Sequence, residues 1–158
     1  RRVDKLEVTV GELKATVGRL EVAVGELRVA VGSMGRRMGR DLELLVLNLY
    51  KDSIERFGID VKRIEKVSIR DREGRYLSRD AKIEVDIYMS DETVYMMEVK
   101  SLADEEDVEW FNTKCDIVAR EKGITSYKKL LVTVNVTREA LERAKNLGVE
   151  VVYGSVID

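Results

Sequence analysis

The 158-residue sequence contains no histidine, no proline and no glutamine, and its one cysteine is Cys115. The absence of histidine excludes imidazole as a general base or metal ligand, so any catalysis must use carboxylates, Lys, Tyr, Ser, Thr or the thiol. A lone cysteine excludes an internal disulfide and fits a reducing compartment, for which we expect the cytoplasm. No apolar run approaches the ~18 residues that a membrane span needs, and no signal peptide is visible.

Charge is plentiful but nearly balanced, with 37% charged residues and a net charge of −2, so no overall basic field indicates nucleic acid. The distribution is uneven, because residues 36–82 carry 13 basic and 9 acidic groups whereas residues 83–109 carry 1 and 10. Few amides and many ion-pair formers are typical of a heat-adapted source. The length suggests about one domain. The chain begins at Arg1 with a repeat already in phase, so we expect that a portion upstream has been cut away.

Residues 1–35 repeat every seven positions, which predicts a coiled coil with the positions a and d apolar. The a positions hold Val3, Val10, Val17, Val24 and Val31, and the d positions hold Leu6, Leu13, Leu20, Leu27 and Met34. Valine at a with leucine at d favours a parallel, two-stranded homodimer. A β-strand is the alternative, but an odd period would turn each repeat to the opposite face of a strand. Glycines at b and valines at f leave open a second packing surface.

Residues 36–40 read as a basic linker, since glycines interrupt the repeat and Arg36, Arg37 and Arg40 follow one another closely. A solvated hinge and a contact with the phosphate backbone of a nucleic acid both explain these arginines.

Residues 41–158 mix helical and strand patterns in the order α-β-β-β-α-β-α-β. We expect helices over 41–58, 103–123 and 137–148, and strands over 63–71, 81–89, 94–101, 128–136 and 149–154. The final β-α-β segment should be a right-handed parallel crossover. The sequence therefore predicts an α/β domain with a mixed central sheet flanked by helices.

The strands 81–89 and 94–101 carry charged residues where a hairpin would bring them together. If the turn is centred on Glu92, Asp86 lies opposite Glu98 and Glu84 lies opposite Lys100, on one face of the sheet. Asp86 and Glu98 could then bind one Mg²⁺ or Mn²⁺ ion, because hard cations prefer carboxylate oxygens. The carbonyl of Val99 is a further candidate ligand. A half-exposed hairpin with a charged outer face is the alternative reading.

The spacing of Asp86, eleven residues, and then Glu98-Val99-Lys100 resembles the PD-(D/E)XK nuclease superfamily, most closely its archaeal Holliday junction resolvase and restriction-endonuclease-like branches. The resemblance covers the elements of about residues 41–136 and implies a restriction-endonuclease-like fold. It also implies DNA as the substrate, a divalent metal at Asp86 and Glu98, and Lys100 as the catalytic amine. The proline of the family motif is replaced by Val85.

Members of this superfamily often add an acidic metal ligand from the first helix, for which Asp41, Glu43, Asp52 and Glu55 compete. We choose Glu43, because it continues the apolar stripe that runs through residues 46–57. On the helix over 103–123, Lys114 beside Trp110 either reaches the site or is a surface charge next to a packing residue. Cys115 reads as a buried apolar group.

Two functions remain open at this point. The first is a Mg²⁺-dependent DNA endonuclease that acts as a coiled-coil dimer, and the second is a nuclease-like binding or assembly module without turnover, tethered by its coiled coil.

Overall fold

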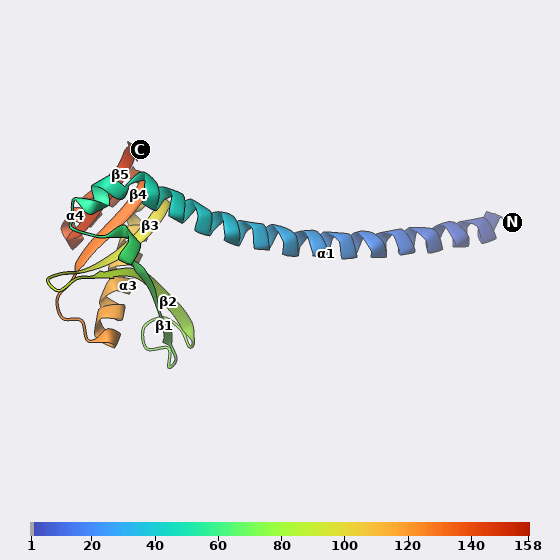
Figure 1. Cartoon of the computed structure of the whole chain (residues 1–158). Helices are drawn as coiled ribbons and strands as arrows, with labels where there is room; N and C mark the ends of the chain where they lie inside the picture. Colours follow the sequence, from blue (N-terminus) through green and yellow to red (C-terminus); the bar gives the residue numbers. More distant parts are fainter. Residues whose placement is uncertain (1) are drawn as a thin grey trace. The chain divides into compact units, whose positions relative to one another are not determined.

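A computed structural model describes the backbone of residues 2–158, and it describes all side chains of this range except those of residue 29 and residues 31–38. The chain divides into two units, Arg1–Asp41 and Leu42–Asp158 (Figure 1). None of the helices in the described range is long and apolar enough to cross a membrane.

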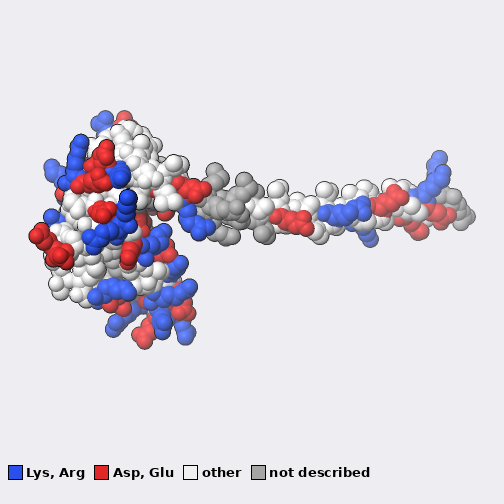
Figure 2. Space-filling view, in the orientation of Figure 1, with Lys and Arg blue, Asp and Glu red and all other residues white. Residues whose placement is uncertain are grey.

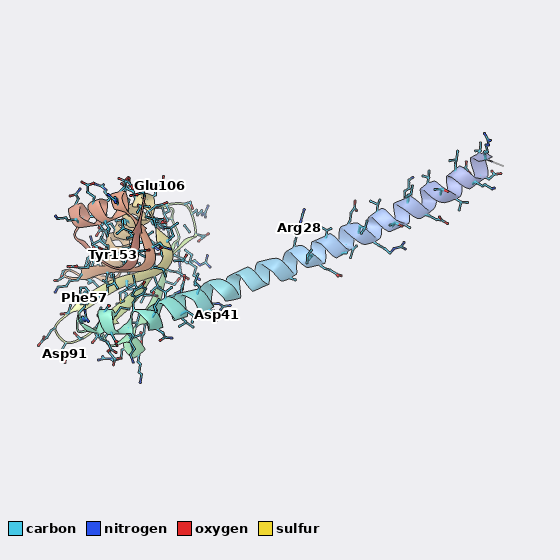
Figure 3. All side chains as sticks on the ribbon, turned by 90° about the horizontal axis from the view of Figure 1, so that it is seen from above. Arg28, Asp41, Phe57, Asp91, Glu106 and Tyr153 are labelled. Carbon is cyan, nitrogen blue, oxygen red and sulfur yellow. The ribbon has the colours of Figure 1, made fainter. Side chains whose placement is uncertain are left out.

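The first unit consists of the helix α1 (Arg2–Leu49) up to Asp41. The prediction of a long N-terminal helix is confirmed. Its Val and Leu side chains at the a and d positions are exposed along residues 3–27, and the sticks in Figure 3 point outward around the helix as far as the labelled Arg28. The expected break at residues 36–40 is wrong for the backbone, because α1 continues through them. The side chains of Arg36 and Arg37 lie outside the described residues, and Arg40 is exposed.

The second unit contains the last turns of α1 and a five-stranded mixed sheet with flanking helices, as the sequence predicted. The elements after α1 are α2 (Lys51–Glu55), a 3-10 turn η1 (Val61–Arg63), β1 (Glu65–Asp71), β2 (Ala81–Met89), β3 (Val94–Ala103), α3 (Glu105–Lys122), β4 (Lys128–Thr137), α4 (Arg138–Leu147) and β5 (Val149–Ile157). The single helix expected over 41–58 is interrupted at Tyr50, which separates α1 from α2.

The strands lie in the order β1-β2-β3-β4-β5. β1, β2 and β3 are antiparallel neighbours, whereas β4 pairs in parallel with both β3 and β5. The predicted parallel crossover through α4 is therefore confirmed. β2 and β4 have the predicted starts. In β2 the alternation of apolar and polar residues follows the alternation of more and less buried positions, whereas β4 is buried on both faces over Leu130–Thr133.

Each face of the sheet has its own apolar core. One core packs Ile87 and Met96 of the sheet against Phe111 of α3 and Ala140 of α4. The other packs a second set of residues, namely Tyr88, Met97, Val99, Val132, Val46 and Ile54, of which the last two belong to α1 and α2. The face from which a side chain leaves β2 or β3 therefore determines which helices it packs against.

The helix α3 starts where the acidic residues at its N-terminus predicted. Asp104 accepts a hydrogen bond from the backbone N–H of Asp107, and the side chain of Asp107 accepts one from the backbone N–H of Asp104. This capping box satisfies two N–H groups that the helix leaves unpaired. It also fixes the side chain of Asp107 beside the last residues of β3, which matters for Lys100 below.

Candidate functional site

The site lies where β2 and β3 part. The hairpin is closed by a two-residue turn, in which the backbone N–H of Ser90 donates to the carbonyl of Thr93. The strands then pair from Met89 with Val94 to Asp86 with Met97, and no pairing of the two strands continues beyond this point in the described structure. The strands still run on separately, since β2 pairs with β1 back to Ala81 and β3 pairs with β4 as far as Ala103.

The predicted register of this hairpin is wrong by one residue. Asp86 lies opposite Met97 rather than Glu98, so the predicted pairing of Glu84 with Lys100 also fails. A shift by one residue exchanges the two faces of a strand. Asp86 therefore shares a face with Met97 on the α1 side of the sheet, whereas Glu98 leaves β3 on the α3 side. The two carboxylates still line one cavity, because it opens between the parted strands.

The cavity has a volume of about 110 Å³. It is lined by Glu43 of α1, Lys66 of β1, Glu84, Val85 and Asp86 of β2, Met97, Glu98 and Val99 of β3, and Lys114 of α3. The structure thus brings together four of the predicted site residues, Glu43, Asp86, Glu98 and Val99, with the alternative candidate Lys114. The other candidates on the first helices, Asp41, Asp52 and Glu55, are not among its lining residues.

Asp86 is the carboxylate whose ionisation is most disturbed. Burial raises its pKa to about 6, Lys66 opposes this rise, and the negative charges of Glu43 and Glu98 add to it. Lys66 is the residue of β1 paired with Asp86, and its Nζ lies 3.7 Å from the Oε2 of Glu43. No local sequence pattern points to Lys66, because only the register between β1 and β2 brings it beside Asp86. The raised pKa therefore reflects chiefly the loss of solvent around the Asp86 carboxylate.

Lys114 is the amine on the α3 side of the cavity. Its side chain is only 9% exposed, and its Nζ donates a short hydrogen bond to Oε1 of Glu98. The same Nζ lies 5.8 Å from the centre of the Trp110 ring. A buried ammonium group requires such a partner, because desolvation of an unpaired charge is costly. Lys114 is therefore not a surface charge but lines the cavity.

Lys100 has a different environment. Its Nζ donates to Oδ1 of Asp107 at 2.8 Å, and Lys100 is not among the residues that line the cavity. Burial raises the pKa of Asp107, but the hydrogen bonds from Lys100 and from the backbone of Asp104 outweigh it, so that the pKa lies below its ordinary value. In this structure the motif lysine supports the start of α3. Glu84, its predicted partner, instead pairs with Lys82 at 2.6 Å.

The donor set of the cavity fits a hard divalent cation, because Glu43, Asp86 and Glu98 supply carboxylate oxygens around a small, partly buried space. Burial disfavours the ionised form of Asp86, and a cation bound beside it would stabilise that form. The carboxylates are not already gathered as a cage: among the described side chains, no three acidic or thiol groups are close enough to hold a metal ion. The ion pairs of Glu43 with Lys66 and of Glu98 with Lys114 explain this, since a cation has to replace them.

A second polar feature lies in the loop between β1 and β2. Asp71 is buried, and its carboxylate accepts hydrogen bonds from the backbone N–H groups of Arg75, Tyr76 and Leu77 at 2.7–3.0 Å. Burial alone raises the pKa of Asp71, but the three N–H groups together hold it below its ordinary value. In Figure 2, Lys and Arg side chains gather at the lower end of the globular unit, where Figure 1 draws this loop. The loop thus has an ordered backbone and a partly basic surface.

Comparison with known proteins gives two matches to families. Residues 1–80 match a family described as a protein of unknown function (DUF3782), and residues 81–150 match the PD-(D/E)XK nuclease superfamily. No curated protein and no solved structure matches the chain. The second matched range holds Asp86, Glu98, Lys100 and Lys114, whereas Glu43 and Lys66 fall within the first. The chain belongs to the DUF3782 family, and its residues 81–150 belong to the PD-(D/E)XK nuclease superfamily, within a fold of the restriction-endonuclease type.

Proposed function

We propose that this protein is a DNA endonuclease that depends on Mg²⁺ or Mn²⁺ and acts as a coiled-coil dimer. One observation carries the proposal: three carboxylates, Glu43, Asp86 and Glu98, and two lysines, Lys66 and Lys114, line one small cavity between parted strands. The match of residues 81–150 to a nuclease superfamily supports phosphodiester hydrolysis as the reaction.

Asp86, Glu98 and Glu43 would hold the metal ion, and the backbone carbonyl of Val99 is a further candidate ligand because Val99 lines the same cavity. A bound divalent ion would supply Lewis-acid stabilisation of the negative charge that develops on the phosphate. The protein's own contribution is positional. α1 supplies Glu43, and β2 and β3 bring Asp86 and Glu98 to the cavity from opposite faces of the sheet.

The amine of the site was assigned to Lys100 from the motif, and we now propose Lys114 in this role. Lys114 lines the cavity and has its Nζ beside Glu98, whereas Lys100 is bound to Asp107. A cation held by Glu98 would compete with Lys114 for this carboxylate. The ammonium of Lys114 would then be available to donate a hydrogen bond to a phosphate oxygen or to the attacking water.

The DNA backbone also requires contacts outside the cavity. Arg40 is exposed and remains a candidate for them, together with Arg36 and Arg37, whose side chains lie outside the described residues. A protein that contacts phosphates releases counterions, so binding that weakens steeply with salt supports these contacts.

The experiment combines metal binding with cleavage. Mn²⁺ is titrated by calorimetry into the wild-type chain, Asp86→Asn and Asp91→Asn, and each is then incubated with supercoiled, branched and single-stranded DNA. Asp91 lies exposed in the turn of the same hairpin and is labelled in Figure 3, so its variant controls for the chemical change alone. We expect Asp86→Asn to lose both metal binding and cleavage and Asp91→Asn to keep both. Cleavage by Asp86→Asn at the wild-type rate refutes the assignment.

A second function is favoured by the placement of Lys100. If the motif lysine is the only amine that can serve catalysis, its pairing with Asp107 leaves the domain without turnover, as a binding or assembly module. Metal binding with no cleavage of any DNA substrate would select this alternative. Cleavage that is lost in Lys114→Met and retained in Lys100→Met would exclude it.

A further inference from the structure

The antiparallel pair of β1 and β2 has two faces of different chemistry. Residues that lie directly opposite one another in such a pair share a face of the sheet. One face packs into the apolar core that contains α3, through Val67, Ile69, Ile83, Val85 and Ile87. The other face holds three opposed pairs, Lys66 with Asp86, Ser68 with Glu84, and Arg70 with Lys82. We call these six residues the polar face of β1–β2.

The polar face of β1–β2 connects the cavity to the loop that joins the two strands. At one end, Lys66 and Asp86 line the cavity. Beyond the cavity, the side chains of Ser68, Arg70 and Lys82 are exposed, so a ligand can reach them. Lys82 precedes Asp86 by four residues in β2, which corresponds to about 13 Å along the strand. The face is therefore an open surface that starts at the proposed metal site.

The charge of this surface becomes positive toward the loop. Next to the cavity, Glu84 is paired with Lys82 at 2.6 Å, and the hydrogen bond from Lys82 lowers the pKa of Glu84, so this carboxylate is ionised and neutralised. Residues 70–82 carry five basic side chains, Arg70, Arg72, Arg75, Arg79 and Lys82, and three acidic ones, Asp71, Glu73 and Asp80. The buried Asp71 is held by backbone N–H groups, so the exposed part of the loop is basic, as Figure 2 shows.

The shape of the loop does not depend on these arginines. Besides the three bonds to Asp71, the hydroxyl of Tyr76 donates to Oε1 of Glu121 in α3 at 2.7 Å. Within the part of the chain whose side chains are described, the guanidinium groups of Arg72 and Arg79 make no hydrogen bond or ion pair, and both residues are exposed. A loop that is ordered before it binds loses less entropy on binding. The two arginines are thus held on a fixed backbone and are open to an anionic partner.

We propose that a DNA duplex lies along the polar face of β1–β2, with its scissile phosphate at the cavity and its flanking phosphates on the arginines of the loop. This assignment rests on the proposed function, because the cavity defines one end of the surface. The distance of about 13 Å corresponds to about four nucleotides, since each strand of a duplex rises ~3.4 Å per nucleotide. Contacts with phosphates would position the duplex without reading its bases.

A phosphodiester backbone suits this surface better than an isolated anion does. Its charges repeat along one direction, and here the metal site and the basic loop lie at the two ends of one strand pair. The cavity itself holds more negative than positive side chains, so it cannot attract DNA before the metal binds. The basic loop would supply this attraction from outside the cavity.

DNA binding by the full chain tests the assignment. A short fluorescent duplex is titrated at several salt concentrations in Ca²⁺, a hard cation that takes the same oxygen ligands as Mg²⁺. The test variant is Arg72→Gln with Arg79→Gln. The matched control, Arg138→Gln with Lys145→Gln, removes two positive charges from exposed positions of α4, which packs against the other face of the sheet. Cleavage in Mg²⁺ is measured in parallel for each protein.

We expect the loop variant to raise the dissociation constant of the duplex at least tenfold. The slope of log affinity against log salt should fall by about 2, because each lost phosphate contact removes ~0.9 from it. The α4 control should keep the wild-type slope. Arg72→Lys with Arg79→Lys should restore most of the slope, since an ammonium group also neutralises a phosphate, and this rescue excludes misfolding as the cause.

The outcomes separate this assignment from the proposed function. If the wild type binds and cleaves DNA but the loop variant has the same slope, the assignment is overturned and the nuclease remains. A loss of the same size in the α4 control also overturns the assignment, because the effect would then come from net charge alone. A wild-type chain that neither binds nor cleaves DNA overturns both.

A second pair of variants tests the path between the cavity and the loop. Ser68 is exposed midway along the polar face of β1–β2 and is not among the residues that line the cavity. Ser68→Glu places a negative charge under the duplex, and Ser68→Gln is its control of equal size. We expect a dissociation constant at least fivefold higher for Ser68→Glu than for Ser68→Gln, while Mn²⁺ binding measured by calorimetry is not weakened. Equal dissociation constants for the two variants would show that DNA does not cross this position and would overturn the assignment.

Discussion

Replacement of Asp86 by Asn should stabilise the folded chain at neutral pH while it removes the proposed metal site. The pKa of Asp86 is raised from 3.8 to about 6, chiefly by burial. The folded state therefore binds the proton more tightly than the unfolded state does. Stability must fall as the pH rises between these two values, since ionisation of Asp86 costs more in the folded chain. Asn carries no charge and avoids this cost.

The magnitude follows from the size of the shift. A difference of about two pKa units corresponds to ~3 kcal/mol once the carboxyl is ionised in both states. At pH 8 the variant should be more stable than the wild type by up to ~3 kcal/mol, whereas at pH 4 the advantage should shrink to roughly half a kcal/mol. A carboxylate that costs stability at a proposed active site is typical of the trade between activity and stability.

The assay is urea denaturation in the presence of a chelator, followed by circular dichroism at pH 4 and pH 8. Protein concentration must be held constant, because a dimer is stabilised by mass action. Asp91→Asn is again the control, since Asp91 is exposed in the hairpin turn. An advantage of Asp86→Asn that is the same at both pH values, or a variant less stable than the wild type at pH 8, would refute the reasoning about burial.

Three further predictions concern other parts of the second unit. Lys114→Met should reduce the cleavage rate at least a hundredfold, which is the loss expected when a positioned catalytic group is removed. Lys100→Met should keep the cleavage rate within a few-fold of the wild type and lower the free energy of unfolding in urea by only ~0.5 kcal/mol. The reverse pattern would restore Lys100 to the site. Gly154→Ala should cost about 1–3 kcal/mol, because its new Cβ would lie 2.3 Å from the hydroxyl of Tyr50, and addition of Tyr50→Phe should recover part of the loss; a Gly154→Ala variant with wild-type stability would contradict this packing. Asp71→Asn should speed hydrogen exchange of the backbone amides in the β1–β2 loop, since it weakens the acceptor of three N–H groups; unchanged exchange would show that the loop is ordered by other contacts.

The strands were predictable because their signal is local. In β2, polar residues alternate with Ile83, Val85 and Ile87, and the structure buries these three on one face. The start of α3 was also predictable, since acidic residues at the first turn favour a helix through its dipole and here include the cap Asp104. The continuous helix through residues 36–40 was not, because each glycine lowers helix propensity by ~1 kcal/mol and local sequence therefore favours a break.

The register of the hairpin was the main error at the site. The turn has no Asn-Gly or Gly-Gly pair that would specify its type. Its centre lies between Asp91 and Glu92, half a residue from the predicted centre at Glu92. This shift changes each pairing by one residue and so exchanges the faces of one strand relative to the other. The prediction that Asp86 and Glu98 lie opposite one another on one face is wrong, but both line one cavity because the strands part after Met97. Alternation along the strands does not contain this feature. Lys66 and Lys114 belong to β1 and α3, so their positions in the cavity depend on tertiary packing.

The charges of the cavity connect the site to its proposed substrate. Glu43, Asp86 and Glu98 bring three negative charges, and Lys66 and Lys114 bring two positive ones. The remaining negative charge would repel a phosphate that approaches the cavity. One divalent cation reverses the sign to a single positive charge. This charge balance would make phosphate binding depend on the metal, so we expect DNA to bind at this cavity only after the cation.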